Sequence, residues 1–184
     1  MGLYLYQRSS KKKVLFKPLE EDQVSLYVCG PTVYSTPHIG NARPAAVFDC
    51  LSRVLRALYS KVTYVRNITD VDDKINAKAA KEGVSIAEVS KRYTDCYHHD
   101  LKALGCLDPD IEPCATTHMP EMIHMISTLI KKAHAYESQG HVLFSVPSYQ
   151  QYGIVSGRDQ QARQAGARVA VESYKRHEED FVLW

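Results

Sequence analysis

Residues 25–58 constrain the fold of this chain more than any other stretch, because they combine a short apolar strand, a polar loop and an amphipathic helix. The apolar run of residues 26–29 stops at Gly30 and Pro31, which is typical of a buried strand. Apolar residues then recur at spacings of three and four, which predicts one buried helix face. They are Val47, Phe48, Leu51, Val54, Leu55 and Leu58. Pro44 fits the first turn of this helix, where its missing N–H is not needed.

The loop at residues 30–43 brings the N-terminus of this helix to the carboxyl end of the strand. Free N–H groups and the helix dipole favour phosphate there, and open α/β sheets bind ligands at this edge. His38 and Asn41 are three residues apart, so both side chains can face one anion while Gly40 lets it approach the backbone. The alternative is a loop histidine followed by an asparagine that caps the helix. These residues alone do not decide between the two interpretations.

A second strand is predicted at residues 61–66, which makes a βαβ unit with the first strand. The polar residues 67–74 follow it directly. Parallel strands of such a unit end at the same edge of the sheet. We therefore expect this polar cluster to lie near Cys29 and His38.

Three aspartates of this cluster allow either a metal site or a helix start. Clustered carboxylates suit Mg²⁺ or Ca²⁺, but the glycine and glutamate of a calcium loop are missing. Capping of a helix at residues 73–80 is the favoured interpretation. The three residues are Asp70, Asp72 and Asp73.

Hairpins and helices are predicted for the rest of the chain. Alternating residues near the N-terminus indicate a hairpin whose basic turn, Lys11–Lys13, is either a solvated loop or an RNA contact. Helices are expected at residues 85–105, with Ser85 and Glu88 as a capping box, and at 119–135, with methionines filling the core. Residues 108–117 should be extended between them. A second hairpin follows, with Val142, Phe144 and Val146 on one face, and the polar residues 149–176 should be partly mobile.

Composition is that of a globular domain with a modest charge. The 184 residues carry a net charge of +2, which neither demands nor excludes a nucleic-acid partner. No apolar stretch approaches the length of a membrane span, and the N-terminus lacks the apolar core of a secretory signal. Five cysteines without a C-x-x-C pair indicate reduced thiols, so we expect a cytoplasmic protein. The sequence does not fix the oligomeric state, and we take a monomer as the expectation.

Several motifs together resemble the cysteinyl-tRNA synthetase family of class I aminoacyl-tRNA synthetases. PHIGN is similar to the HIGH motif of that class, and the wider match runs through YVCGPTVYSTPHIGNAR and YVRNITDVDDKI. It continues in ATTHMPEMIHMISTLI, YGIVSG, GARV and DFVLW, so it covers nearly the whole chain. Two places depart from the family pattern. Asn41 stands in the fourth HIGH position, and residues 175–180 lack the family's proline before the aspartate.

The resemblance implies an α/β fold with a Rossmann-like parallel-sheet nucleotide-binding domain. Residues 1–135 would form the first half of that catalytic domain, and residues 136–184 would begin a connective insertion. The family continues with the second half of the fold, a KMSKS loop and an anticodon-binding domain. We therefore expect this chain to be an incomplete N-terminal fragment that is inactive alone.

The family's activity assigns roles to the residues of the strand–loop–helix stretch. Cysteine is activated with ATP, accompanied by Mg²⁺, and the cysteinyl group is transferred to tRNA(Cys). The resemblance makes His38 and Asn41 catalytic, with Gly40 also at the ATP. It places the substrate cysteine beside Cys29, Gly30, Thr32 and Thr69. Asn41 can still hydrogen-bond a phosphate but cannot carry a positive charge.

The resemblance also implies one Zn²⁺ per complete subunit, with Cys29 as a ligand. A thiolate binds Zn²⁺ far better than a hydroxyl does, which separates cysteine from serine where size cannot. The family's other ligands, a cysteine, a histidine and a glutamate, lie beyond Trp184. The alternative is that Cys29 is a small apolar core residue that ends a buried strand. The other four cysteines are expected to be ordinary thiols.

Two other functions compete with the tRNA ligase. One is a cysteine ligase that uses the same adenylate chemistry to join cysteine to an amino sugar. The other is a non-catalytic nucleotide-binding or RNA-binding fragment that keeps only the first half of the fold. Cysteine-dependent ATP–pyrophosphate exchange separates the enzymes from the non-catalytic fragment, because it needs no acceptor.

Overall fold

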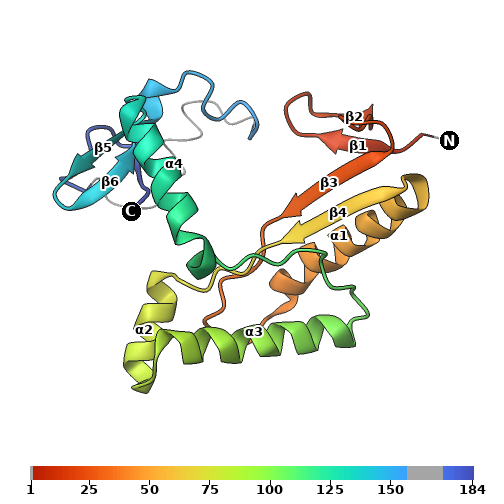
Figure 1. The fold of residues 1–184 in the computed structure, drawn as a ribbon, viewed down its shortest axis with the longest axis horizontal. Helices are drawn as coiled ribbons and strands as arrows, with labels where there is room; N and C mark the ends of the chain where they lie inside the picture. Colours follow the sequence, from red (N-terminus) through yellow and green to blue (C-terminus); the bar gives the residue numbers. More distant parts are fainter. Residues whose placement is uncertain (1, 157–171) are drawn as a thin grey trace. The chain divides into compact units, whose positions relative to one another are not determined.

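A computed structural model describes residues 2–156 and 172–184 of the chain (Figure 1). These residues divide into two compact units, Pro18–Met119 on one side and Met1–Lys17 with Pro120–Trp184 on the other. Each unit is described by itself. The expected boundary between residues 135 and 136 stays a prediction.

The unit Pro18–Met119 is built on a βαβ motif. Strand β3 (Gln23–Val28) pairs in parallel with β4 (Lys61–Arg66), and helix α1 (Ile39–Leu58) connects them (Figure 1). In the register, Gln23 lies opposite Lys61 and Val28 lies opposite Arg66. The predicted βαβ unit is thus confirmed, with the first strand starting three residues earlier than its apolar run.

An extended segment follows the other edge of β4. Parallel bridges join Val65 to Ile111 and Ile68 to Cys114. The Ile68 N–H donates to the Pro113 carbonyl at 2.9 Å. The extended conformation expected at residues 108–117 is therefore confirmed as far as Cys114, where the short 3-10 helix η1 (Ala115–His118) takes over.

Two capped helices separate β4 from this segment. Asp72 caps α2 (Asp73–Glu82), since its Oδ1 accepts the Lys74 N–H at 2.9 Å. Ser85 caps α3 (Ile86–Ala103), because its Oγ accepts the Glu88 N–H at 3.1 Å. Both helix starts agree with the sequence prediction.

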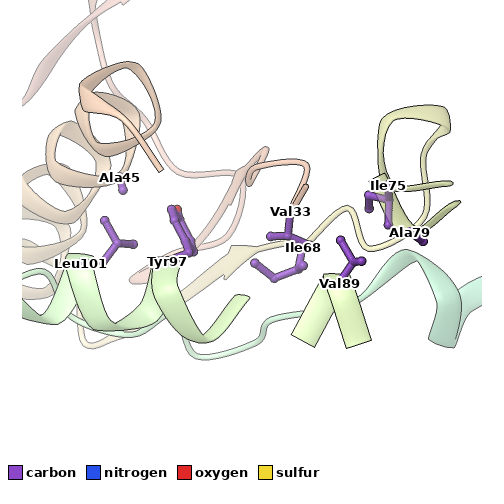
Figure 2. Close-up of a cluster of buried hydrophobic side chains, with 8 residues drawn as sticks. All are labelled: Val33, Ala45, Ile68, Ile75, Ala79, Val89, Tyr97 and Leu101. Atoms are coloured by element: carbon purple, nitrogen blue, oxygen red, sulfur yellow. The ribbon is translucent and has the colours of Figure 1, made fainter. Parts of the chain in front are cut away.

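A single apolar cluster holds these elements together (Figure 2). Val33 and Ile68 come from the segments that follow β3 and β4, and Tyr97 and Leu101 reach them from α3. The remaining members are Ala45, Ile75, Ala79 and Val89. The core thus packs directly beneath the ends of the two parallel strands.

Helix α1 differs from its prediction in both start and orientation. It begins at Ile39, so Pro44 is its sixth residue rather than part of its first turn. The missing Pro44 N–H leaves the Gly40 carbonyl without its usual helical donor. Pro44 is tolerated because the helix start is fixed by a strong cap at His38, described below.

The predicted apolar face of α1 is only partly buried, because Leu55 is fully buried and Phe48 and Leu51 are half-buried. Val47, Val54 and Leu58 are 44–55% exposed. The helix also buries Ala45, Asp49 and Ser52. Asp49 tolerates burial because Arg53 Nε and the Leu107 N–H donate to its carboxylate at 2.8 and 3.0 Å. Leu55 therefore forms the packed face of this helix together with small and polar residues.

The other unit contains small antiparallel sheets and one helix. Strands β1 (Tyr4–Gln7) and β2 (Lys12–Leu15) form the predicted N-terminal hairpin. Strands β5 (Ala135–Ser138), β6 (His141–Phe144) and β7 (Phe181–Val182) form a second sheet, followed after β6 by the 3-10 helix η2 (Val146–Ser148). Gln139 and Gly140 make the predicted turn, with φ of 48° and 84°.

Three predictions for this unit are wrong in detail. Helix α4 (Met119–Lys131) ends four residues early, because β5 starts at Ala135. Met122 and Met125 are exposed and fill no core. On β6 the buried side chain is Leu143, not its neighbours Val142 and Phe144. Residues 157–171, within the stretch expected to be mobile, lie outside the described residues.

Two further observations concern the whole described chain. None of the helices within residues 2–156 and 172–184 combines the length and apolar character that crossing a membrane requires. All five cysteines are free thiols.

Candidate active site

The segments that leave β3 and β4 are joined by hydrogen bonds. The Gly30 N–H donates to Asn67 Oδ1 at 3.0 Å, and the Thr69 N–H donates to the Pro31 carbonyl at 3.0 Å. The Val33 N–H in turn donates to the Thr69 carbonyl at 3.2 Å. The expected approach of the polar cluster to the end of the first strand is confirmed.

Gly30 is required by the closeness of these two segments. A Cβ atom at this position would lie 1.6 Å from the Asn67 carbonyl oxygen, a backbone atom that cannot swing aside. Only glycine fits here. The backbone just after Cys29 is thereby held against the end of β4.

Thr32 and Thr69 face each other across the same edge. They form an isolated parallel bridge that continues the pairing of β3 and β4. Thr69 is half-buried, and its Oγ1 accepts a hydrogen bond from Asn67 Nδ2 at 3.3 Å. Both predicted cysteine-binding threonines thus lie at the carboxyl ends of the parallel strands.

Cys29 follows the last residue of β3 and is exposed. The alternative of a buried core cysteine is therefore wrong for this structure. The strand pattern explains the error, because Val24 and Val28 are buried whereas the intervening Tyr27 is 61% exposed. The apolar run on which the prediction rested covers both faces of a strand that buries only one.

His38 and Asn41 form a reciprocal capping box at the start of α1. His38 Nδ1 accepts the Gly40 N–H at 3.0 Å, and Asn41 Oδ1 accepts the His38 N–H at 3.1 Å. The capping interpretation is thus confirmed as geometry. It also orients both side chains. A neutral imidazole that accepts at Nδ1 carries its proton on Nε2, and an amide that accepts at Oδ1 keeps Nδ2 as a donor.

The backbone N–H groups at this helix start are largely used within the protein. Gly40 donates to His38 Nδ1, while Asn41 and Ala42 both donate to the His38 carbonyl, at 2.8 and 3.1 Å. The sequence-based expectation of several free N–H groups is therefore wrong. Donors for an anion come instead from His38 Nε2 and Asn41 Nδ2, at the positive end of the helix dipole.

Gly40 makes room for the capping histidine. A Cβ atom here would lie 2.8 Å from His38 Cε1 and 2.9 Å from Nδ1. The glycine is also exposed, so the backbone beside the imidazole remains accessible from solvent.

A small pocket connects the helix start with the strand ends. Thr32, His38 and Asn41 line it together with Tyr34, Tyr93 and Tyr97, and its volume is about 30 Å³. That is room for about one or two water molecules, so the pocket by itself does not enclose a larger ligand. Thr32 links the helix start to the strand ends, because it lines this pocket and also bridges to Thr69.

The aspartates after β4 are engaged as structural acceptors. Asp72 caps α2, and Asp70 Oδ1 accepts the Thr116 N–H at 3.0 Å. Among the residues that the structure describes, no three His, Cys, Asp or Glu side chains gather as metal ligands. The helix-capping interpretation of this cluster is supported, and the metal interpretation is not.

A buried arginine lies directly behind the strand ends. Arg66, the last residue of β4, is 1% exposed and packs over the rings of Tyr64 and Tyr97. Glu112 faces it at 4.0 Å and pairs with His98 at 2.7 Å. Arg66 Nε and Glu112 Oε2 have no hydrogen-bond partner among the described residues. The guanidinium is therefore buried between two aromatic rings and the Glu112 carboxylate.

Comparison with known proteins identifies the class to which this arrangement belongs. The chain belongs to the family of class I tRNA synthetase (C) catalytic domains, whose sequence model matches residues 15–184.

The chain is similar throughout to curated bacterial proteins named Cysteine–tRNA ligase. It is 56% identical to the protein of Rhodospirillum rubrum over 184 residues, which is the whole chain and 40% of the relative. It is 54% identical to that of Parvibaculum lavamentivorans, again over the whole chain and 39% of the relative. The chain thus spans about two fifths of the length of the curated relatives that it matches.

Sequence reasoning missed two residues of this site. The sequence placed Arg66 at the end of a predicted strand and Asn67 in the polar cluster, and it assigned no role to either residue. A signal for Asn67 exists, since an asparagine that follows one parallel strand faces the glycine that follows the other. Nothing in the pattern of KVTYVR distinguishes Arg66 as buried.

Proposed function

We propose that this chain forms the ATP- and cysteine-binding part of a cysteine–tRNA ligase. Cysteine is first activated with ATP to cysteinyl-adenylate and then transferred to tRNA(Cys). One observation carries the proposal beyond family membership. The carboxyl ends of two parallel strands and the start of α1 meet through Thr32, which bridges to Thr69 and shares a pocket with His38 and Asn41.

The start of α1 is suited to the phosphates of ATP. His38 Nε2 and Asn41 Nδ2 are hydrogen-bond donors set by the capping box, and Gly40 leaves the backbone beside them uncovered. Phosphoryl chemistry needs positioning and charge stabilisation more than a covalent catalyst. We assign the stabilisation of the transferring phosphate to His38 and Asn41. Mg²⁺ accompanies ATP through its phosphates, because the described residues offer no carboxylate cluster for it.

The strand ends are suited to the substrate cysteine. Cys29 is exposed beside the fixed backbone of Gly30, and Thr32 and Thr69 stand across the same edge. A Zn²⁺ ion bound at Cys29 would favour a thiolate over a hydroxyl and so distinguish cysteine from serine. Cys29 fits as one donor of such a site. The described residues do not complete a ligand set, and we route no step through the ion.

The same proposal covers the architecture. The parallel pair of β3 and β4, extended by residues 110–114, agrees with the first half of a Rossmann-like sheet. Residues 136–184 would begin a connective insertion. A monomer in the cytoplasm remains our expectation for the protein.

The choice of acceptor rests on the relatives. An amino sugar would use the same adenylate chemistry, but the similar curated proteins are named as tRNA ligases. We therefore assign tRNA(Cys) as the acceptor. Charging assays that offer tRNA(Cys) and an amino sugar separately distinguish the two.

Cysteine-dependent ATP–pyrophosphate exchange tests the proposed activity. The full-length product of the gene that encodes this chain should exchange with cysteine, and with serine at least about a hundredfold less efficiently. The 184-residue chain should be inactive by itself. Exchange that is absent from the full-length product, or that does not depend on cysteine, would exclude the proposal.

A further inference from the structure

The side chain of Asn67, which follows β4, hydrogen-bonds both to the residue after Cys29 and to Thr69 on its own segment. Its Oδ1 accepts the Gly30 N–H at 3.0 Å, and its Nδ2 donates to Thr69 Oγ1 at 3.3 Å. The side chain is half-buried and lies directly after β4. One amide therefore contacts the residue that follows Cys29 and, on the other side, Thr69.

The orientation of this amide is fixed by chemistry. The Gly30 N–H is a donor only, so it must face the carbonyl oxygen of the amide. The NH₂ group is then directed to Thr69 Oγ1, which must accept. No rotation of the amide by half a turn satisfies the Gly30 N–H.

The accepting role of Thr69 determines where its proton goes. A hydroxyl has one O–H donor and two acceptor lone pairs. With one lone pair occupied by Asn67 Nδ2, the Thr69 proton is turned away from Asn67 and is available to an acceptor on a ligand. A side chain that replaced Asn67 and accepted a hydrogen bond from Thr69 Oγ1 would turn the Thr69 proton toward itself.

The accepting role of Asn67 determines the path of the backbone beside Cys29. Gly30 approaches the Asn67 backbone carbonyl so closely that a Cβ atom would lie 1.6 Å from it. Backbone hydrogen bonds from the Thr69 N–H to the Pro31 carbonyl and from the Val33 N–H to the Thr69 carbonyl join the two segments further along, and the Asn67 amide supplies the bond next to Cys29. The location of Cys29 Sγ depends on this path, because Cys29 directly precedes Gly30 in the chain.

We infer that Asn67 is a positioning residue for cysteine recognition. It directs the Thr69 hydroxyl proton toward the substrate and holds the Cys29–Gly30 backbone in place, without touching the substrate itself. The inference rests on the proposed function, since it takes Cys29 and Thr69 as cysteine-binding residues. The substrate group that Thr69 meets is an acceptor such as a carboxylate oxygen.

Asn67→Asp separates the two hydrogen bonds. The carboxylate still accepts from the Gly30 N–H, but its second oxygen also accepts, so the Thr69 proton turns toward it. In the full-length gene product, ATP–pyrophosphate exchange should show a KM for cysteine raised at least about tenfold, with the KM for ATP changed less than twofold. Asn76→Asp is the matched control, because it adds the same charge on an exposed asparagine of α2 and should change neither KM.

A double-mutant cycle tests whether Asn67 acts through Thr69. Thr69→Val alone should raise the KM for cysteine, and adding Asn67→Asp to it should raise the KM further by less than about twofold. Fully additive effects would overturn the inference, because the new carboxylate would then act on its own. An unchanged KM for cysteine in Asn67→Asp would overturn it as well.

Hydrogen exchange measures the hydrogen bond from the Gly30 N–H to Asn67 Oδ1 independently of activity. Peptides that contain the Gly30 amide should exchange faster in Asn67→Ala, which removes the acceptor, and at the wild-type rate in Asn67→Asp, which keeps it. Equal exchange in wild type and Asn67→Ala would overturn this part of the inference. A wild-type protein without cysteine-dependent ATP–pyrophosphate exchange would instead overturn the proposed function. Hydrogen exchange at the Gly30 amide would still show whether Asn67 holds the backbone beside Cys29.

Discussion

At the residue scale, His38 caps a helix and is also the proposed phosphate ligand. Its Nδ1 caps α1 through the Gly40 N–H, and this same bond leaves Nε2 as the donor that a phosphate needs. The two interpretations of the sequence, a helix cap and a phosphate ligand, are therefore compatible. The capping hydrogen bond to Nδ1 orients the imidazole so that Nε2 carries the donor proton.

The two roles of His38 can be separated by substitution. His38→Asn keeps a capping acceptor, whereas His38→Ala removes it and should cost about 1 kcal/mol of stability. Both variants should slow adenylate formation at least about tenfold in the full-length gene product, with cysteine binding nearly unchanged. Single-turnover kinetics and urea unfolding provide the two measurements. Wild-type kinetics in His38→Asn would remove the imidazole from catalysis.

Gly30 is a position at which the close approach of two segments permits only glycine. Gly30→Ala should destabilise the protein by at least about 3 kcal/mol, because its Cβ meets the Asn67 carbonyl oxygen at 1.6 Å. Gly83→Ala is the control. Gly83 has a φ of 69°, and a methyl group added there would meet no other atom within 4 Å, so only left-handed strain of about 1–2 kcal/mol applies. Similar urea midpoints for the two variants would mean that the strand ends separate easily.

At the element scale, sequence periodicity predicted α1 but not its buried face. Spacings of three and four were satisfied by two sets of residues on the same helix. In the predicted apolar set Val47 and Val54 are exposed although Leu55 is buried, whereas Ala45 and Asp49, which lie outside that set, are buried. Burial of Asp49 depends on Arg53 and on the Leu107 N–H, which is 58 residues away in the chain. A local pattern cannot contain such a long-range hydrogen bond.

Helix caps and turns were more predictable from the sequence than the buried faces of helices. Asp72, Ser85 and the Gln139–Gly140 turn act through neighbours within three residues, so their sequence signals are complete. The methionines of α4 failed as core residues for the opposite reason. Hydrophobic character alone does not state which surface, if any, a helix face meets.

Helix α3 contributes a pH-sensitive element through Tyr97. Burial raises the pKa of Tyr97 to about 12, although the nearby charge of Arg66 opposes the shift. Below pH 10 the folded and unfolded states both keep the proton. Between pH 10 and about 12 only the unfolded state loses it, so stability should fall as pH rises through this window.

Urea unfolding at pH 9 and 11 checks the contribution of Tyr97. Wild type should lose more stability between these values than Tyr97→Phe, which cannot ionise. Tyr93→Phe, a half-buried position on the same helix, should behave like wild type. Equal losses in wild type and Tyr97→Phe would contradict the assignment of the raised pKa to Tyr97.

Asp180 closes a turn that begins at His177. The Asp180 N–H donates to the His177 carbonyl at 3.0 Å, which forms the turn without a proline. The buried carboxylate accepts from Tyr136 Oη at 2.6 Å and from the Val146 and His177 N–H groups at 3.0 and 3.1 Å. A fully satisfied carboxylate thus holds β5, η2 and the turn together.

Asp180→Asn should therefore be costly. The amide presents an NH₂ group to at least one donor, and we expect a loss of about 1.5–3 kcal/mol. Tyr136→Phe removes a single donor to the carboxylate and should cost less. Thermal unfolding of both variants measures the difference. A tolerated Asp180→Asn would show that the turn is held by its backbone hydrogen bond alone.

At the scale of the whole molecule, the described residues bring together four of the residues proposed for the site. His38, Asn41, Thr32 and Thr69 are brought together within Pro18–Met119. The sequence predicted this grouping because all four follow parallel strands or begin the connecting helix. It could not predict the hydrogen bond from the Gly30 N–H to Asn67 Oδ1, which joins residues 37 positions apart.

Zinc binding tests the completeness of the site. Zinc sites need three or four protein ligands, and the described residues provide no such group around Cys29. We predict that the 184-residue chain holds zinc at well below one ion per chain, whereas the full-length gene product binds one ion through Cys29. Cys29→Ser should abolish that zinc. Cys50→Ser is the control, because it changes another exposed thiol and should leave the metal in place. Elemental analysis of the purified proteins gives the answer, and full zinc occupancy in the longer Cys29→Ser protein would show that this exposed thiol is not a ligand.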